Sequence, residues 1–249
     1  MQTLFFSVTF GLAILSFSCA DSSGKKRSAM NAGKGFAVVE LFTSEGCSSC
    51  PPADNAVAKL LKENNSNVYV LGYHVDYWDN LGWRDIFSNA AYTQVQRNYA
   101  KAFKLSSAYT PQIIVNGTAQ FVGSDEKKLN AAVNKSLQQP STIQVSIDAK
   151  LADDHEVNVH YSINVSDASL QVALIQLSAE NKIQRGENTG ATLHHVNIVR
   201  DIKTVPAAAS GSVALKIPGN LTAADCKVIA FAQDTSDNKI SGATETGIK

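Results

Sequence analysis

The sequence predicts an α/β domain over residues 35–139, followed by an all-β, sandwich-like domain over residues 140–249. Up to Pro140, short apolar runs alternate with segments in which apolar residues recur at helical spacing, and this alternation is typical of layered α/β folds. After Pro140 the helical period disappears. Apolar and polar residues then alternate with a period of two between frequent turns, as in a β-sandwich.

The composition is that of a globular protein. Of the 249 residues, 44% are hydrophobic and 18% are charged, and 22 Lys and Arg balance 22 Asp and Glu. This zero net charge argues against a nucleic-acid partner, because nucleic-acid binders usually carry a basic surplus. The length fits one or two domains, and no apolar run is long enough to span a membrane.

Residues 1–19 are interpreted as a signal peptide and residues 20–34 as a flexible tether. The apolar segment 4–17 has the length of a signal-peptide core. Two forms of cleavage remain open, because Ser18-Cys19-Ala20 suits an ordinary signal peptidase whereas the residues before Cys19 resemble a lipoprotein signal, in which Cys19 would carry a lipid anchor. The third interpretation of the segment is a buried N-terminal helix. Either form predicts secretion across the inner membrane, as a periplasmic or membrane-tethered protein in a compartment where disulfides persist.

The first domain is expected to follow the order β-α-β-loop-α-β-β-α. Helices are predicted just after Cys50, over about 89–104, and after Ser124, which is expected to cap the last helix. Asn116-Gly117 favours a hairpin turn. The predicted strands lie at residues 36–42, 68–73, 112–115 and 118–122.

The second domain is expected to be built from short antiparallel strands. Ile143, Val145 and Ile147 begin the alternation, and turn-forming pairs such as Pro218-Gly219 interrupt it. The predicted strands lie near residues 143–151, 157–163, 170–178, 193–200, 212–217, 226–233 and 238–247.

Cys47 and Cys50 form a Cys-x-x-Cys pair between the first strand and a helix. Pro51 and Pro52 suit the first helical turn, where their missing N–H groups leave nothing unpaired. Cys47 is then expected at the accessible end of the helix, whose N-terminal dipole lowers the pKa of its thiol below the usual value of about 8.5. Cys50, one turn on, is expected to be more buried and to resolve a mixed disulfide between Cys47 and a client.

Two other interpretations of the pair stay open. One is a structural disulfide, although so short a loop is a poor place for a passive crosslink. The other is a metal site, although zinc would need a second cysteine pair or paired histidines nearby, and nothing in the sequence points to a copper site that uses His74. The favoured interpretation is a redox pair, which implies no dissociable cofactor and no metal.

A strand, a Cys-x-x-Cys pair at a helix start, and Thr110-Pro111 before a β-hairpin resemble the thioredoxin superfamily. The longer segments VELFTSEGCSSCPPAD and YHVDYWDNLGWRDIFSN resemble a bacterial family of secreted thioredoxin-like proteins. The resemblance implies that Cys47 is the nucleophile and Cys50 the resolving thiol. It also implies that Pro111 is a cis-proline facing the disulfide, with the Thr110 backbone pairing with an extended client. The alternative for Pro111 is an ordinary trans proline at a strand start.

The sequence departs from the thioredoxin pattern at one acidic position. Thioredoxins keep a buried acid six residues before the first cysteine, but Leu41 occupies that place and Glu40 lies one residue earlier. A one-residue bulge could restore Glu40 as proton acceptor for Cys50. Otherwise Glu40 is a rim glutamate or one paired elsewhere. Glu45 is nearer to the cysteines but is expected to be exposed.

The aromatic loop 74–89 either lines a groove beside the cysteines or forms a small satellite core. His74 is expected to be packed or hydrogen-bonded rather than a ligand. Surface ion pairs are expected among Asp76, Asp79, Arg84 and Asp85.

In the second domain, the polar loop 185–190 either reaches across to the cysteines or lies in solvent. His194 and His195 are neighbours in a predicted strand and should point to opposite faces, so that one metal ion is not expected to bind both. Cys226 is expected to be a buried, inert thiol.

The leading hypothesis is a thiol–disulfide oxidoreductase of the bacterial cell envelope. Its expected partners are protein or peptide thiol and disulfide clients and a redox partner protein. The alternative is a non-catalytic, thioredoxin-like binding protein that uses its aromatic loop and sandwich to hold a partner. The direction of exchange stays open, because Ser48-Ser49 has neither the histidine of oxidising relatives nor the Gly-Pro of reducing ones.

Overall fold

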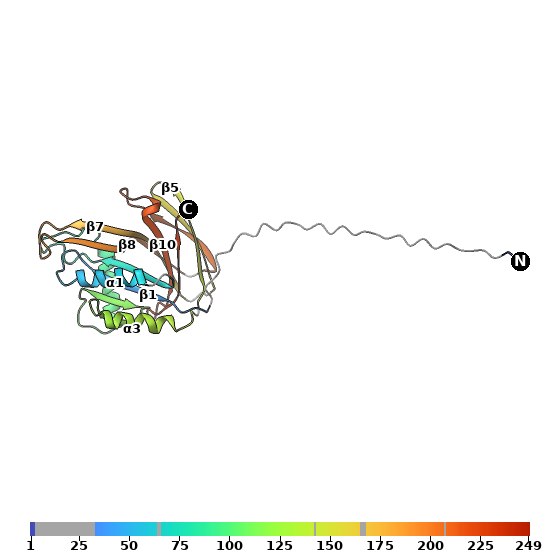
Figure 1. The fold of residues 1–249 in the computed structure, drawn as a ribbon, viewed down its shortest axis with the longest axis horizontal. Coiled ribbons are helices and arrows are strands. Elements are labelled where there is room, and N and C mark those ends of the chain that lie inside the picture. Colours follow the sequence, from blue (N-terminus) through green and yellow to red (C-terminus); the bar gives the residue numbers. More distant parts are fainter. Residues whose placement is uncertain (3–32, 64–65, 142, 165–167, 207) are drawn as a thin grey trace.

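The computed structural model describes residues 1–2, 33–63, 66–141, 143–164, 168–206 and 208–249. Cys19, with its expected lipid anchor, and most of the expected signal peptide and tether lie outside the described residues. Within the described ranges, no helix is long and apolar enough to cross a membrane. The ribbon combines a mixed region of helices and strands with a β-rich region (Figure 1).

The mixed region follows the predicted order of elements. Its last helix is capped by Asp125 and not by the expected Ser124, because the Asp125 side chain accepts a hydrogen bond from the backbone N–H of Lys128. The elements are β1 (Ala37–Thr43), α1 (Pro51–Glu63), β2 (Val68–His74), α2 (Ala90–Ala102), β3 (Gln112–Val115), β4 (Ala119–Val122) and α3 (Glu126–Leu137).

The β-rich region contains a strand near each predicted position. Two of them, β7 and β8, are longer than predicted and form a hairpin that projects past the other strands (Figure 1). The elements are β5 (Val145–Asp153), β6 (Glu156–Ile163), β7 (Ser169–Lys182), β8 (Thr192–Pro206), β9 (Ser210–Lys216), the 3-10 helix η1 (Ala223–Asp225), β10 (Cys226–Gln233) and β11 (Ile240–Gly247).

Strands from both regions share one large mixed sheet. Its order is β11-β10-β7-β8-β2-β1-β3-β4, and β5-β6-β9 form a second, antiparallel sheet. The two regions meet where β8 runs parallel to β2, with Gly72 opposite Ile198. A domain boundary at residues 139/140 remains a prediction, because the sheet itself continues across both regions.

The junction between β2 and β8 involves Gly72 and Asn197. A Cβ atom at Gly72 would lie in ordinary van der Waals contact with β8, 3.4 Å from the carbonyl oxygen of Val196. Asn197 takes the left-handed conformation (φ 51°), which asparagine tolerates better than most residues. Its side-chain amide donates a hydrogen bond of 3.0 Å to the carbonyl oxygen of Val70 in β2.

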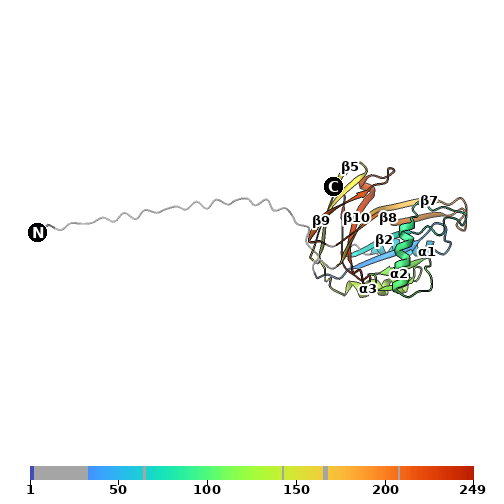
Figure 2. The ribbon, with the colours of Figure 1, turned by 180° about the vertical axis from the view of Figure 1, so that it is seen from behind.

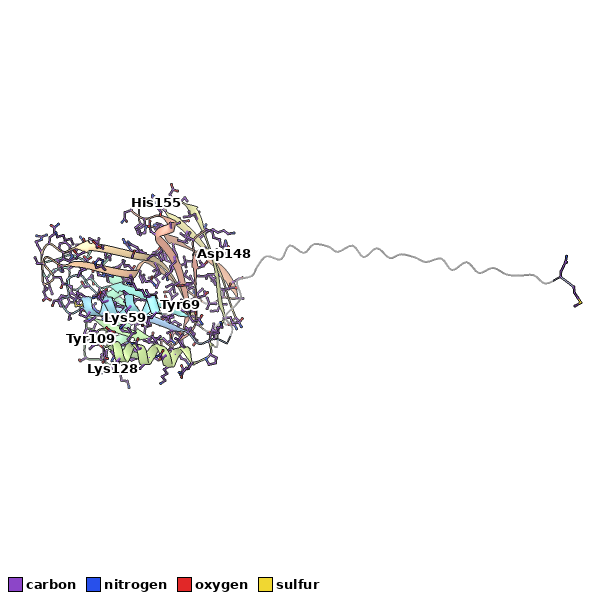
Figure 3. The ribbon with its side chains drawn as sticks, in the orientation of Figure 1. Lys59, Tyr69, Tyr109, Lys128, Asp148 and His155 are labelled. Atoms are coloured by element: carbon purple, nitrogen blue, oxygen red, sulfur yellow. A yellow bond between two sulfur atoms is a disulfide. The ribbon has the colours of Figure 1, made fainter. Side chains whose placement is uncertain are left out.

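Helices cover both faces of the mixed half of the sheet. Helices α1 and α3 lie on one face, as Figure 1 shows, and α2 lies on the other, as Figure 2 shows. Lys59 of α1, labelled in Figure 3, forms an exposed ion pair of 3.0 Å with Glu126 of α3. The small sheet packs its apolar side chains against β7 and β10, which gives the β-rich half a core of its own.

Replacing Asn197 tests how much the junction contributes to stability. Asn197→Ala removes the hydrogen bond to the buried Val70 carbonyl and places alanine at a positive φ, so the free energy of unfolding should fall by about 1–3 kcal/mol. Asn197→Gly loses the same hydrogen bond but tolerates the backbone conformation, and should cost less. Urea unfolding of the oxidised proteins measures both values. Equal stability of wild type and Asn197→Ala would contradict the role given to this side chain.

Candidate active site

The two cysteines of the Cys-x-x-Cys pair are joined in a disulfide between β1 and α1. Their Cα atoms lie 5.4 Å apart, and the backbone N–H groups of Ala53 and Asp54 donate to the carbonyl oxygen of Cys50 as α1 begins. Both cysteines are fully buried, whereas Ser48 and Ser49 between them are exposed. The expectation of an accessible Cys47 is therefore wrong for this state of the protein, because other segments cover the loop.

The Thr110–Pro111 peptide bond is cis, as the resemblance implied. Pro111 and Ala53 of α1 both lie against Gly123, because a Cβ atom built on this glycine would come 3.1 Å from Pro111 Cβ and 2.9 Å from Ala53 Cβ. The indole N–H of Trp78 donates a 2.8 Å hydrogen bond to Thr110 Oγ1. Tyr109, labelled in Figure 3, donates its hydroxyl to Gln120 in β4 (2.6 Å).

Glu40 lies on the far side of the sheet from α1. The register of β1 against β2 is continuous from Ala37 to Thr43, so no bulge redirects the Glu40 side chain. Burial raises the pKa of Glu40 to about 7, although it accepts a 2.6 Å hydrogen bond from Tyr99 of α2. Because its neighbours Val39 and Leu41 face α1 and strand side chains alternate, Glu40 is paired elsewhere and does not face the helix of the cysteines.

A buried histidine connects the two ends of the cysteine loop. His195 of β8 donates from Nδ1 to Asp54 Oδ1 at 3.1 Å, and Asp54 also accepts from Thr43 Oγ1 at 2.9 Å. On the other side, His195 Nε2 lies 3.5 Å from Glu45 Oε1. Within the described part of the chain, Nε2 has no hydrogen-bond partner of good geometry, so Glu45 acts on it through charge. Asp54 follows Cys50 by one helical turn and Glu45 precedes Cys47 by two residues, so one imidazole spans the loop.

The charge of this imidazole is set by its neighbours. Burial alone would lower the pKa of His195, but the hydrogen bond to Asp54 and the nearby Glu45 carboxylate raise it to about 10. His195 is therefore a cation at neutral pH, buried beside two carboxylates. Glu45 itself accepts hydrogen bonds from Trp83 Nε1 (2.8 Å) and from Asn181 of β7. The expectation that Glu45 is exposed is therefore wrong.

A second buried pair supports the same loop. Asp85 Oδ2 lies 2.6 Å from His74 Nδ1 and accepts a 2.9 Å hydrogen bond from the backbone N–H of Glu45. Burial would raise the pKa of Asp85, but His74 and these hydrogen bonds lower it overall. The His74 and His195 rings meet edge to face at 4.7 Å. His74 is thus packed and hydrogen-bonded as expected, whereas Asp85 is a buried group and not part of a surface pair.

The connection between β7 and β8 reaches the cysteine loop. Asn188 donates its side-chain amide to the carbonyl oxygens of Glu45 (2.8 Å) and Cys47 (3.0 Å). Glu187 Oε2 accepts from the hydroxyl of Ser48 at 2.7 Å and from its backbone N–H at 3.2 Å. Of the two interpretations of loop 185–190, the structure selects the one in which it reaches the cysteines.

The aromatic loop packs onto the main core, and the expected groove beside the cysteines remains a prediction. Tyr77 and Trp78 pack against that core, and Trp83 donates its hydrogen bond to Glu45, two residues before Cys47. Phe87 is buried against both His74 and His195, with ring centroids 5.1 and 5.8 Å away. Leu81 and Ile86 of the same loop remain exposed.

Asp54 was not among the predicted site residues, although the sequence carries a weak signal for it. Asp54 lies four residues after Cys50, a spacing that places both on one face of a helix. His195 was correctly expected to point away from His194, which is exposed and pairs with Glu180. Cys226 is buried as expected, and burial raises the pKa of its thiol to about 11.

Across the described ranges, no group of three or more His, Cys, Asp or Glu side chains is arranged to hold a metal ion. The Nδ1 atoms of His74 and His195 each face a carboxylate.

Comparison with known families adds the evolutionary context. A family of proteins of unknown function, DUF1223, matches residues 38–233. The chain belongs to this family. The match includes the cysteine loop, the aromatic loop and the β7–β8 hairpin, so the clustered residues all lie in the part of the chain that defines DUF1223.

Individual relatives indicate a thioredoxin-like relationship. The thioredoxin of Methanocaldococcus jannaschii is 29% identical over 100 residues, which cover 40% of this chain and 94% of that protein. A crystal structure of a protein from Agrobacterium tumefaciens is similar with a TM-score of 0.60 and 30% identity, over 86% of this chain and 95% of that chain. HBP35 of Porphyromonas gingivalis shares the fold at 17% identity, with a TM-score of 0.59 over 88% and 76% of the two chains.

The protonation of His195 predicts how stability changes with pH. Between pH 6.5, the ordinary value, and about 10 the folded protein holds a proton that the unfolded chain has lost. The free energy of unfolding should therefore fall as pH rises through this range, by up to about 1.4 kcal/mol per pH unit. Its contribution is fully present below pH 6.5.

Unfolding in urea at several pH values between 6 and 10 measures this slope. In His195→Gln the additional slope should disappear, because glutamine does not titrate, and the difference between the two proteins should be largest at low pH. Parallel pH profiles for wild type and His195→Gln would show that the buried imidazole is not charged in the fold.

Proposed function

We propose that this chain is a thiol–disulfide oxidoreductase of the bacterial cell envelope. The observation that carries the proposal is the Cys47–Cys50 disulfide at the start of α1. Helix N-termini stabilise thiolates, so the reduced Cys47 has a physical reason to be the attacking sulfur. The thioredoxin-like relationship supports the same interpretation.

The proposed exchange needs no cofactor. In the oxidising direction, a client thiolate attacks Cys47 Sγ, the Cys47–Cys50 bond breaks, and Cys50 leaves as a thiolate that takes up a proton. A second client thiolate then attacks the mixed disulfide and releases Cys47. Two electrons pass from the client dithiol to the cysteine pair, and the reverse sequence reduces a client. A redox partner protein would restore the starting state.

The wider assignment also belongs to this proposal. We infer a thioredoxin-like domain followed by a β-sandwich, with residues 1–19 directing export and Cys19 as a candidate lipid attachment point. Protein or peptide thiols and disulfides are the proposed clients, and the Thr110 backbone is the proposed contact for an extended client segment.

One observation favours the alternative of a non-catalytic binding protein. Both cysteines are fully buried, so the disulfide could serve as an inert crosslink under a partner-binding surface. The reduction potential of the Cys47–Cys50 pair, measured against a defined dithiol buffer, separates the two. A potential within the range of thiol-exchange enzymes supports the oxidoreductase, and a disulfide that resists every dithiol supports the scaffold.

Trapping of clients provides a direct test of the order of attack. Cys50→Ala leaves the attacking sulfur but removes the resolving one, so mixed disulfides with envelope proteins should accumulate and disappear on reduction. Cys47→Ala should give few adducts, and Cys226→Ala should behave as wild type because Cys226 is buried. Non-reducing gels of the three variants measure this. Equal adducts from Cys47→Ala and Cys50→Ala would contradict a dithiol mechanism.

The two buried acids should contribute differently to exchange. Asp54 lies on α1 one turn after Cys50, whereas Glu40 faces α2 across the sheet. Asp54→Asn should slow dithiol exchange by about tenfold or more, in the range by which a positioned acid or base changes a rate. Glu40→Gln is the matched control, because it also replaces a buried carboxylate by an amide of the same size, and it should retain the wild-type rate. Stopped-flow reduction of the disulfide measures the exchange rates of both variants. A slower rate in Glu40→Gln than in wild type would show that Glu40 also contributes to exchange.

A further inference from the structure

The β7–β8 connection, residues 183–191, ends in a compact turn that we call the hairpin tip. The turn is closed by backbone hydrogen bonds from Ile183 N to Ala191 O (2.9 Å) and from Gly190 N to Ile183 O (2.8 Å). Gly186 has a positive φ of 80° and lies against Trp83 of the aromatic loop, where a Cβ atom on the glycine would come within 3.1 Å of Trp83 Cβ. The tip therefore rests on the aromatic loop as a preformed unit.

The hairpin tip is hydrogen-bonded to the cysteine loop beside the disulfide. The Asn188 side chain donates a hydrogen bond to the carbonyl oxygen of Cys47. Glu187 accepts hydrogen bonds from the backbone N–H and the hydroxyl of Ser48, the residue after Cys47. These contacts join residues about 140 positions apart in the sequence. The Ser48 hydrogen bonds lower the pKa of Glu187, so the carboxylate is charged at neutral pH.

The position of the hairpin tip limits how a thiolate can reach the sulfur of Cys47. A thiolate must approach the Cys47 sulfur in line with the S–S bond, but neither cysteine is exposed while the hairpin tip is in place. Glu187 is exposed and its neighbours Gly186 and Asn188 are half-buried, and hydrogen bonds at the surface open locally at low cost. Reaction of the disulfide therefore requires the tip to move, and its side chains set how far and how often it does.

We propose that Glu187 and Asn188 are specificity-determining residues that favour small thiols and extended peptide thiols over folded proteins as reactants of the Cys47–Cys50 pair. This inference rests on the proposed oxidoreductase function and assigns its substrate preference. A low-molecular-mass dithiol needs only a narrow opening beside Ser48. A cysteine on a folded protein brings its neighbouring surface with it and needs the whole tip displaced.

The reaction step is the same for both classes. A thiolate of the incoming dithiol bonds to Cys47 Sγ while the Cys47–Cys50 bond breaks, and Cys50 takes up a proton. The second thiol of the dithiol then loses its proton and displaces Cys47. The incoming dithiol is oxidised by two electrons and the protein pair is reduced by two.

The test compares Glu187→Ala, Asn188→Ala and the double variant with wild type. The matched control is Glu180→Ala, which removes an exposed carboxylate from the same hairpin, where it contacts His194 and not the cysteine loop. Each oxidised protein is reacted with dithiothreitol, with reduced thioredoxin as a protein dithiol, and with a water-soluble phosphine. The phosphine takes an oxygen from water as it reduces the disulfide, so it reports access to the sulfurs without thiol exchange.

The expected result is a graded increase in rate. Loss of the Glu187 or Asn188 contacts should raise reduction by the phosphine and by dithiothreitol about three- to tenfold, as hydrogen bonds of ordinary net strength imply. The rate with reduced thioredoxin should rise by a larger factor, and the double variant should exceed either single one. Glu180→Ala should react as wild type. Thermal unfolding of each oxidised variant confirms that the fold is intact.

The other outcomes separate two kinds of failure. Unchanged phosphine rates in the double variant would overturn the proposal, because the hairpin tip would not control access. Equal increases for dithiothreitol and reduced thioredoxin would overturn the substrate preference. A faster phosphine reaction without exchange by any dithiol would support the covering role of the tip but overturn the oxidoreductase function on which the preference rests.

Discussion

The arrangement of the candidate site depends on the contact between β8 and β2. Few backbone positions form this contact, since Gly72 and Ile198 pair directly and the Asn197 side chain completes the junction by binding the Val70 carbonyl. Two residues before Asn197, the same strand carries His195 into the space between α1 and the cysteine loop. A shift of β8 by one residue would turn His195 to the opposite face, and the buried charges beside the disulfide would lose their partner.

Burying charged groups has a cost that this site offsets by pairing them. An isolated buried carboxylate is strongly disfavoured, but Asp54 and Glu45 share the His195 cation, and Asp85 pairs with His74. Breaking such a cluster costs more than never having formed it, because a partner is left unpaired in a low-dielectric interior. The cluster therefore fixes both ends of the cysteine loop, and it places positive and negative charge close to the sulfurs whose protonation changes during exchange.

The sequence by itself determined the local structure and the position of the cysteine pair. Buried strands and amphipathic helices have periods that can be read directly, and Pro51 and Pro52 after the cysteines fixed where α1 begins. The alternation of strand side chains was enough to separate His194 from His195. These features depend on neighbours in the chain, so local patterns carry them. The alternation along β1 also predicts which side of the sheet Glu40 faces, once the structure shows that β1 has no bulge.

Only the tertiary structure decided what surrounds the disulfide. Glu45 and Asp85 have the polarity of surface residues, and nothing near them in sequence predicts burial; they become buried because β8, the hairpin tip and the aromatic loop close over them. Asn188 and Glu187 reach the cysteine loop across most of the chain length, a contact set by the pairing of β8 with β2 and not by any local preference. The sequence therefore located the cysteine pair, whereas long-range strand pairing determined its charge environment and its access to solvent, because both depend on groups that are distant along the chain.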